Sequence, residues 1–403
     1  MQGFVGQCKF SAQAASLDHP NAIVEHRAQV GDTIEAENAD SIEKREFLLT
    51  LISRRSVKRA GLRYLRRGID DEGYSANTVE TEQILSSPTW SASAMTHSIV
   101  QIRGSIPLYF SQSPYAFKPA PELQRSEESN HAAMKAHFAR LRDRFGHVQV
   151  ASLVAKTGSE AIIGAEYQRM VSRLNAETGP DNAPVDFEWF DFHEACRGMK
   201  FENVSLLMDR LGSKLDSFGH TTILHGQIVG RQSGILRTNC MDCLDRTNVV
   251  QSAYGRRALE TQLGELGITI DLGVDRSTQW FNALWADNGD AISKQYTSTA
   301  ALKGDYTRTR KRDYRGALND IGLSVSRYFN NIVNDYFSQA AMDYLLGNVN
   351  HQVFEEFEAD LISGDPAISM SKLRQQASTS VVVTETRYSL IMNLPQSTIV
   401  PSL

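Results

Sequence analysis

One segment of the chain, GILRTNCMDCLDRTNVVQS at residues 234–252, gives the clearest indication of the architecture. Residues Gly234–Thr238 are typical of a short strand, and Thr247–Leu263 has the apolar spacing of a helix. The segment Cys240–Arg246 is therefore predicted to be the turn that leads from the strand into the helix. At such a turn the first N–H groups of the helix lack partners and the helix dipole adds positive charge, so a phosphate group binds well there.

The spacing of Cys240 and Arg246, C-x5-R, fits a phosphate-binding loop that carries its own nucleophile. Positive charge at a helix N-terminus favours the thiolate form of cysteine, which is the form that attacks phosphorus. Backbone N–H groups of the loop would hold the phosphate oxygens, and the Arg246 guanidinium would close the ring with a bidentate fork. We therefore expect Cys240 as nucleophile and Arg246 as phosphate clamp, in a reaction that needs no metal and no cofactor.

Other residues near the loop are predicted to take supporting roles. A carboxylic acid has to protonate the leaving alkoxide and later activate water. Of the two loop aspartates we favour Asp242 for this role, with Asp245 as a structural or orienting residue, and Thr247 is placed to hydrogen-bond to the sulfur. The residues expected to bind substrate are Asn239, Met241, Cys243 and Leu244 in the loop, and Arg308 and Lys311 outside it.

Two other functions of the pair Cys240 and Cys243 are disfavoured. A zinc knuckle needs four ligands, and the sequence has no second C-x2-C or H-x3–5-H pair with the right spacing. A redox C-x-x-C motif usually has small or aromatic residues between its cysteines, whereas here they are Met241 and Asp242. The C-x5-R spacing alone also arises by chance. The interpretation as a phosphate-binding loop therefore depends on the high density of Asp, Arg, Thr and Asn around it.

The rest of the chain alternates between strand-like and helix-like segments, which predicts an α/β fold. We expect a cysteine-phosphatase-like core in which helices flank a central mixed sheet and the phosphate-binding loop joins a strand to a helix. Strands are predicted at 98–110, 147–156 and 185–193, and helices at 127–145, 160–174, 203–218, 321–346 and 352–362.

Composition indicates a globular chain. The 403 residues are 41% hydrophobic and 22% charged, and the net charge of −5 predicts no general attraction to nucleic acid or to anionic membranes. Four cysteines make no dense framework, so a reducing compartment is favoured, and neither a signal peptide nor a long apolar run is found. Residues 1–45 are expected to be a poorly ordered or irregular arm, 46–365 the catalytic domain, and 366–403 a disordered tail.

Local charge departs from this average. The run Arg54–Arg67 is half basic and could receive an anionic headgroup, with Val57, Leu62, Tyr64 and Leu65 in strands about an Ala60-Gly61 turn. A second basic cluster could take the same role; it comprises Arg308, Arg310, Lys311, Arg312 and Arg315. Asp287–Asp290 is interpreted as a polar turn that could supply the acid if the loop aspartates do not.

The block RTNCMDCLDRTN (237–248) closely resembles the signature of the Sac-family phosphoinositide phosphatases, the family that includes the synaptojanin amino-terminal domain. Further blocks resemble the family over roughly residues 50–350, among them RRGIDDEGYSANTVETEQIL (66–85), QIRGSIPLYFSQ (101–112), FDFHEACRGMKFENVS (190–205) and WADNGDAISKQY (285–296). The chain looks as if it lacks the family's amino-terminal subdomain and the transmembrane helices that some members carry.

This resemblance implies an enzyme that removes a phosphate from the inositol ring of a phosphatidylinositol phosphate, with Cys240 as nucleophile and Arg246 as clamp. It also implies a cytoplasmic protein that is peripheral on the cytosolic face of endomembranes, such as those of the ER, Golgi or endosomes, with no nucleic-acid partner. Two alternatives stay open: a catalytically impaired lipid-binding or scaffold protein, and a protein tyrosine phosphatase. Against the latter, Asn239 stands where that class usually has a histidine.

Overall fold

The computed structural model describes residues 2–13, 44–89, 91, 93–113, 120–177, 183–242, 244–270, 272, 279–302, 304–309 and 314–355. The chain divides into two compact units, Met1–Tyr328 and Phe329–Leu403. The catalytic domain expected over 46–365 stays a prediction. The expected tail at 366–403 lies outside the described residues.

Among the described residues, the first unit is built on a nine-stranded mixed sheet, in which seven strands follow the order β1-β2-β3-β4-β11-β7-β8. Strands β1 to β4 pair antiparallel, whereas β4, β11, β7 and β8 run parallel to one another. The antiparallel strands are β1 Gln2–Gln13, β2 Lys44–Arg55, β3 Val79–Ser86 and β4 Thr96–Arg103. The remaining parallel strands are β7 His147–Ser152, β8 Val185–Trp189 and β11 Gly234–Asn239. The α/β fold with a mixed sheet, predicted from the sequence, is confirmed.

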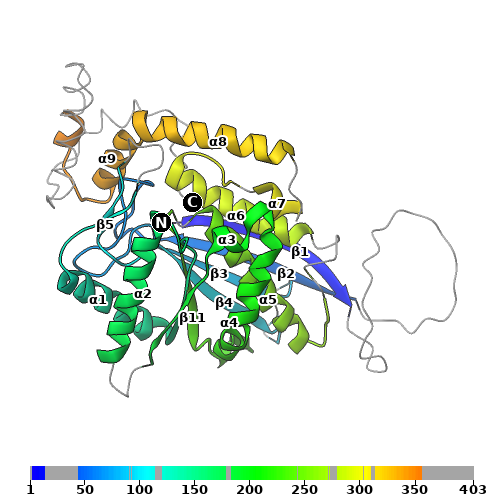
Figure 1. The fold of residues 1–403 in the computed structure, drawn as a ribbon. Helices are drawn as coiled ribbons and strands as arrows, with labels where there is room; N and C mark the ends of the chain where they lie inside the picture. Colours follow the sequence, from blue (N-terminus) through cyan, green and yellow to red (C-terminus); the bar gives the residue numbers. More distant parts are fainter. Residues whose placement is uncertain are drawn as a thin grey trace, which may run out of the picture. The chain divides into compact units, whose positions relative to one another are not determined.

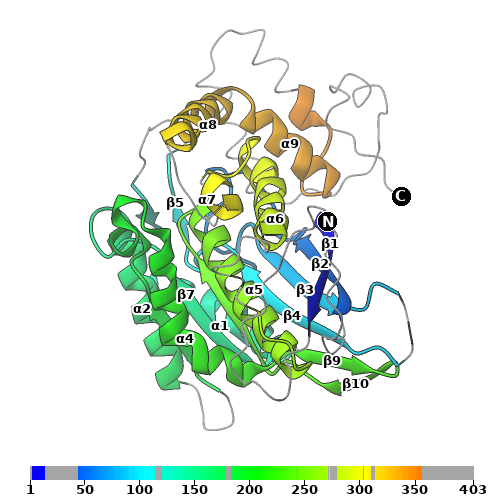
Figure 2. The same ribbon diagram turned by 90° about the vertical axis from the view of Figure 1, so that its right-hand side faces the viewer.

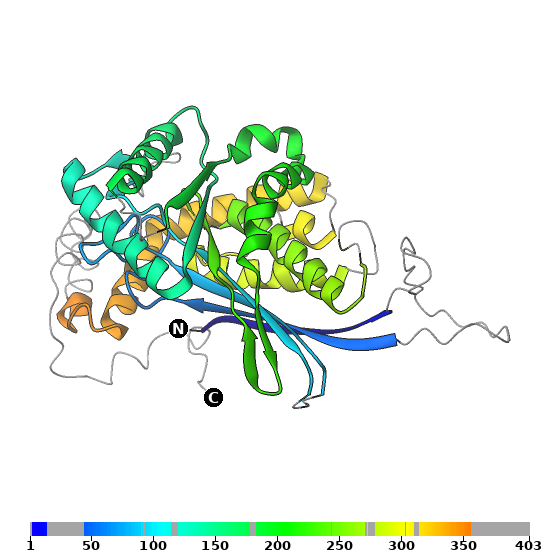
Figure 3. The ribbon, with the colours of Figure 1, turned by 90° about the horizontal axis from the view of Figure 1, so that it is seen from below.

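A hairpin extends this sheet next to the first residues of β4. It consists of β9 (Thr221–Leu224) and β10 (Gln227–Gly230), and β9 pairs antiparallel with Thr96–Ser98. Figure 2 shows β1 to β4 side by side with the hairpin at their end, and Figure 3 shows it in green, projecting beside β4. A separate two-stranded sheet joins β5 (Phe110–Ser111) to β6 (Glu122–Leu123).

Helices cover both faces of the sheet, and in Figure 1 they lie on either side of β11. Successive residues of β11 point to opposite faces, as the strand period of two requires. Ile235 packs with α1 and α2, and Leu236 packs with α4 and α5. The helices of this unit are α1 Glu127–Phe145, α2 Glu160–Glu177, α3 Phe192–Ala195, α4 Ser205–Phe218, α5 Asp245–Glu265, α6 Gln279–Thr297 and α7 Gly304–Thr309, with 3₁₀ turns at Arg197–Met199 and Phe201–Val204.

Helix α8 (Tyr314–Val333) crosses the division between the units, and the second unit contains α9 (Asp335–Leu345). The prediction of a single helix over 321–346 is therefore wrong, because the helix is interrupted at Asn334, between α8 and α9. The helix predicted at 352–362 can be followed only to residue 355 within the part that the structure describes.

Three further expectations are corrected. Gln2–Gln13 is a regular strand rather than an irregular arm, because its backbone pairs with β2 along its length. The segment 56–68 forms turns, so the strands predicted around Ala60 are wrong. Asp287–Asp290 lies inside α6 and not in a turn, since Asn288 is fully buried and its Oδ1 accepts a hydrogen bond from Ser53 Oγ at 2.6 Å.

Candidate active site

The predicted phosphate loop lies where a buried parallel strand gives way to a long helix. Strand β11 is buried throughout and ends at Asn239, and α5 begins at Asp245. This confirms the expected strand–turn–helix arrangement, with the helix starting two residues earlier than predicted. The carboxyl end of a parallel strand followed by a helix N-terminus is a favoured place for anions, because unpaired helix N–H groups point into the loop.

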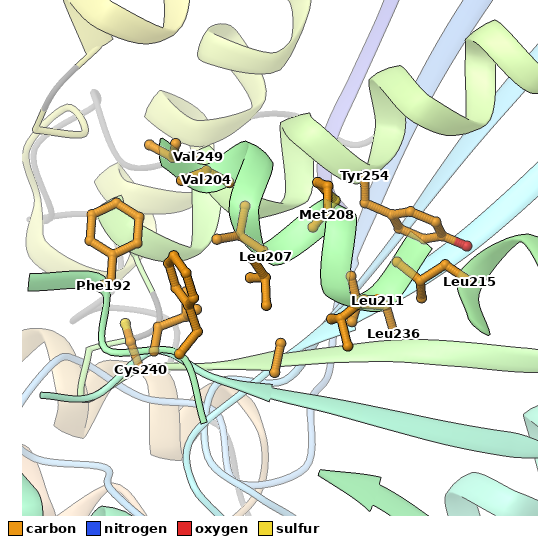
Figure 4. Close-up of a cluster of buried hydrophobic side chains, with 14 of the residues drawn as sticks. Phe192, Val204, Leu207, Met208, Leu211, Leu215, Leu236, Cys240, Val249 and Tyr254 are labelled. Carbon is orange, nitrogen blue, oxygen red and sulfur yellow. The ribbon is translucent and has the colours of Figure 1, made fainter. Parts of the chain in front are cut away.

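Cys240 is the first residue after the strand and is 1% exposed. Its sulfur accepts a hydrogen bond from Thr247 Oγ1, a hydroxyl in the first turn of α5, at 3.5 Å. Figure 4 shows Cys240 at one end of a buried apolar cluster, close to Phe192.

The Arg246 guanidinium is bound to a carboxylate from another element. Its Nη1 and Nη2 atoms donate to the two oxygens of Glu160 at 2.8 and 2.7 Å, and Nη1 also donates to the Leu153 carbonyl at 3.2 Å. Burial works against the charged guanidinium, but Glu160 and the Cys240 sulfur together raise the pKa of Arg246 above its usual value. A phosphate would have to compete with Glu160 for this fork.

Asp242 is clamped between two arginines of the basic run. Its Oδ2 lies 2.8 Å from Arg63 Nη2, and its Oδ1 accepts a hydrogen bond from Arg67, which also donates to the Met241 carbonyl. Burial favours the neutral acid, yet Arg63 and Arg67 outweigh it and hold the pKa of Asp242 well below its usual range. In this arrangement the carboxylate is ionised and has no proton to give.

Asp245, the first residue of α5, holds a neighbouring segment in place. Its oxygens accept hydrogen bonds from Arg327 at 3.0 and 3.3 Å and from the Leu302 N–H at 2.6 Å. Arg327 is almost fully buried and also donates to the Ala300 carbonyl at 2.9 Å. These contacts support the orienting role that we assigned to Asp245.

Three of the loop residues predicted to bind substrate, Asn239, Met241 and Leu244, have buried side chains. Asn239 donates to the Gly104 carbonyl at 2.6 Å and accepts from the Tyr167 hydroxyl at 3.2 Å, which fixes the end of β11. Met241 and Leu244 are 4% and 1% exposed and pack into apolar clusters. Only their backbone groups are therefore left to meet a phosphate. Cys243 lies outside the described residues.

The predicted contribution of the second basic cluster is not seen in the described residues. Arg308 forms ion pairs with Asp287 and Asp290, each at 2.8 Å, so both aspartates are engaged away from the loop. Lys311, Arg310 and Arg312 lie outside the described residues, as does the side chain of Arg315.

The basic residues of the run Arg54–Arg67 contact different partners. Arg54 pairs with Glu80 and Glu82 on β3, and Arg55 is buried, donating to the Gly61 carbonyl at 2.6 Å and to Asn77. Of the run, Arg63 and Arg67 reach the predicted phosphate loop, where both contact Asp242. The sequence indicated the charge but not which members would converge there, because that depends on how the turns at 56–68 fold.

Sequence analysis missed Glu160 entirely. It stands 86 residues before Arg246, at the start of α2, and its Oε2 also accepts from the Ala155 N–H at 2.8 Å. Arg246, followed by the Ala155 N–H, lowers the pKa of Glu160 despite its burial. No local pattern marks this contact, since it depends on β7 and β11 lying side by side.

A cavity of about 420 Å³ opens at the ends of β7 and β8, beside the loop and not over Cys240. Its walls are formed by Lys156, Thr157, Trp189, Phe190, Asp191, Glu194, Ala195 and Arg210. Lys156 and Arg210 make part of this wall cationic, but Cys240 and Arg246 take no part in it. Across the described ranges, no helix combines the length and apolar character needed to cross a bilayer.

Comparison with known proteins places these features in a family. Residues 1–197 match the model of the SacI homology domain. The chain is 43% identical over 311 residues to human Phosphatidylinositide phosphatase SAC2, covering 76% of this chain and 26% of the relative. It is 41% identical over 322 residues to the zebrafish (Danio rerio) SAC2, covering 79% and 27%. With zebrafish Phosphatidylinositol-3-phosphatase SAC1-A it shares 40% identity over 315 residues, covering 76% and 51%.

The chain thus spans about a quarter of the SAC2 relatives and about half of SAC1-A. These alignments cover about three quarters of the chain, and the SacI homology model matches its first 197 residues. With the mixed sheet and the strand–loop–helix arrangement around Cys240, they show that the chain belongs to the Sac-domain family.

Proposed function

We propose that this chain hydrolyses a phosphate monoester on the inositol ring of a phosphatidylinositol phosphate through a phosphocysteine intermediate. The observation that carries the proposal is the position of Cys240 between β11 and α5, with its sulfur hydrogen-bonded to Thr247. The relatives named as phosphatidylinositide phosphatases support the substrate class.

In the first step the Cys240 thiolate attacks phosphorus and the bond from phosphorus to the inositol oxygen breaks. Loop N–H groups and Arg246 stabilise the charge on the equatorial oxygens. The leaving alkoxide takes a proton from an acid. In the second step water attacks phosphorus, the acid's conjugate base takes the water proton, and the phosphorus–sulfur bond breaks to release phosphate and thiolate.

Asp242 becomes the acid only once substrate is bound. An incoming phosphate is a stronger attraction for Arg63 and Arg67 than a single carboxylate, and its negative charge disfavours a second anion beside it. Both effects raise the pKa of Asp242 from the low value set by its arginine partners. Substrate binding and protonation of the acid are thereby coupled at this site.

The test measures phosphate release from vesicles that contain each phosphatidylinositol monophosphate in turn, with EDTA present. We expect turnover by the native protein and by Cys8→Ser, a control cysteine in β1, and none by Cys240→Ser. Full activity in Cys240→Ser would exclude the thiol mechanism. Loss of activity with EDTA, in a sample shown to stay folded, would point to a metal-dependent reaction.

The same assay separates the alternatives. Faster turnover of a phosphotyrosine peptide than of any lipid would favour a protein tyrosine phosphatase. Vesicle binding without turnover, by a sample shown to be folded, would favour a lipid-binding protein in which Arg246 stays paired with Glu160.

A further inference from the structure

Three potential metal ligands converge at the opposite end of α5 from the catalytic loop. His97 is the second residue of β4, His220 directly precedes β9, and Glu265 is the last residue of α5. One ligand atom from each lies within 4.8 Å of the others. Because α5 has 21 residues, Glu265 lies about 30 Å along the helix from Asp245.

The histidine at the centre of this cluster has an unexplained buried nitrogen. His97 is 1% exposed, and its Nε2 has no hydrogen-bond partner among the described residues. Its other ring nitrogen, Nδ1, lies 3.2 Å from Thr222 Oγ1, the residue opposite His97 in the β4–β9 ladder. A buried polar atom without a partner is costly, and a metal-bound histidine commonly hydrogen-bonds through its second nitrogen in this way.

The other two residues have a spacing that a metal ion requires. His220 Nε2 lies 3.1 Å from Glu265 Oε2. In a tetrahedral zinc site with bonds of about 2.0–2.1 Å, neighbouring ligand atoms are about 3.3 Å apart. The rings of His97 and His220 meet edge to face with centroids 4.7 Å apart. The Glu265 side chain is half-exposed and that of His220 is 9% exposed, so a small rotation of the two would complete the set around His97.

The chemistry of the three donor groups also suits a transition-metal ion. Two imidazoles and one carboxylate match a zinc-type ion, whereas Ca²⁺ and Mg²⁺ prefer oxygen ligands throughout.

We propose that His97, His220 and Glu265 form a site for one divalent transition-metal ion of the zinc type, which joins the ends of β4, β9 and α5. The fourth position is left to water, which reaches it past the exposed Glu265 side chain. The ion lies far from Cys240 and takes no part in the phosphatase reaction, so this proposal does not rest on the proposed function.

The site is tested on the full chain carrying Cys240→Ser, which removes one competing thiolate, after metal is stripped with EDTA and the chelator is dialysed away. Titration with Co²⁺ is followed by absorption, and titration with Zn²⁺ by calorimetry. We expect one ion per chain, visible bands of a four-coordinate cobalt site without thiolate charge-transfer bands, and a higher melting temperature with Zn²⁺.

Glu265→Gln and His220→Ala should each weaken binding about 100-fold or more, because even loss of an outer hydrogen bond costs 10–100-fold. The control is His225→Ala, an exposed histidine in the turn between β9 and β10, which should bind as the parent does. Glu265 is at the surface, so Glu265→Gln keeps the test valid if His220→Ala does not fold. Unchanged affinity in Glu265→Gln, thiolate bands, or no stoichiometric binding would overturn the proposal and leave only a His220–Glu265 ion pair.

Discussion

The two arginines that hold Asp242 also determine how its carboxylate can act. Arg63 and Arg67 keep it ionised in the absence of substrate, whereas the proposed reaction needs it protonated when the inositol oxygen leaves. The role of this residue therefore depends on whether the leaving group needs a proton.

We expect Asp242→Asn to lower kcat on a phosphatidylinositol phosphate by about 100- to 10,000-fold, the usual contribution of a general acid. On para-nitrophenyl phosphate the loss should be much smaller, because nitrophenolate leaves without a proton. KM should fall on both substrates, since Arg63 and Arg67 are freed for phosphate. Steady-state kinetics on the two substrates measures the difference.

Asp245→Asn is the comparison variant for this prediction. Asp245 is bound to Arg327 and Leu302, so its replacement should disturb the loop and lower activity on both substrates by the same factor. An equal loss on both substrates for Asp242→Asn would instead make Asp242 a positioning residue.

At the scale of elements, α5 connects the catalytic loop to the rest of the core through close packing against α6. Gly255 is a point of close approach between the two helices. A Cβ atom built on it would lie 2.5 Å from Trp285 Cζ2 and 2.9 Å from Gln83 Oε1, which itself accepts a hydrogen bond from Trp285 Nε1. There is no room for a side chain here.

Gly255→Ala should therefore lower the free energy of unfolding by about 1–3 kcal/mol, the usual cost of overpacking a core. Gly264→Ala, in the same helix with nothing within 4 Å of its Cβ, should leave stability unchanged or raise it by up to about 1 kcal/mol. Urea unfolding followed by tryptophan fluorescence gives both values. A stable Gly255→Ala protein would mean that α5 and α6 can move apart.

The same contacts explain which elements could be predicted from the sequence. Helix α1 and the strand–loop–helix unit at Cys240 follow from apolar periodicity and were predicted with nearly correct bounds. Helix α6 was missed because Asn288 and Gly289 look like a turn. Asn288 Oδ1 accepts a hydrogen bond from Ser53, and a Cβ on Gly289 would lie 2.5 Å from Asn248, so tertiary packing selects residues that local propensity disfavours.

The candidate site, like the fold, could be predicted from the sequence only where its residues lie close together in the chain. The proposed nucleophile, the proposed clamp and the threonine bonded to the sulfur lie within eight residues, so one motif contains them. Arg63, Arg67 and Glu160 come from distant turns and a distant helix, and no spacing in the sequence relates them to Cys240. Their roles follow only from the three-dimensional contacts.

For the first unit as a whole, a buried histidine links stability to pH. His137 Nε2 accepts a hydrogen bond from Arg237 Nε at 2.9 Å, and Nδ1 lies 2.9 Å from the Gly73 carbonyl, so the ring is neutral with its proton on Nδ1. Burial, reinforced by Arg237, lowers the pKa of His137 well below its usual value. In the unfolded chain the pKa returns to about 6.5.

Below about pH 6.5 the unfolded state binds a proton that the folded state excludes. The free energy of unfolding therefore decreases as the pH is lowered, by up to about 1.4 kcal/mol per pH unit. His137→Asn keeps the donor to Gly73 and removes this titration. The native protein should therefore lose its stability advantage over His137→Asn between pH 7 and pH 5, by up to about 2 kcal/mol.

Urea unfolding at pH 5, 6 and 7 measures this effect, and the four tryptophans, all within Met1–Tyr328, report on the first unit. His193→Asn, a change at an exposed histidine, should track the native protein at every pH. A constant difference between native and His137→Asn proteins would show that His137 is not the group responsible.

The ion pair of Arg246 with Glu160 has a consequence for selectivity. Every phosphate ester has to displace the same carboxylate, so the pair subtracts the same free energy from the binding of each one. It weakens the affinity for all inositol phosphates and for inorganic phosphate by one common factor, and the ratios between them are untouched. Discrimination among ring positions must therefore come from groups that contact the rest of the headgroup.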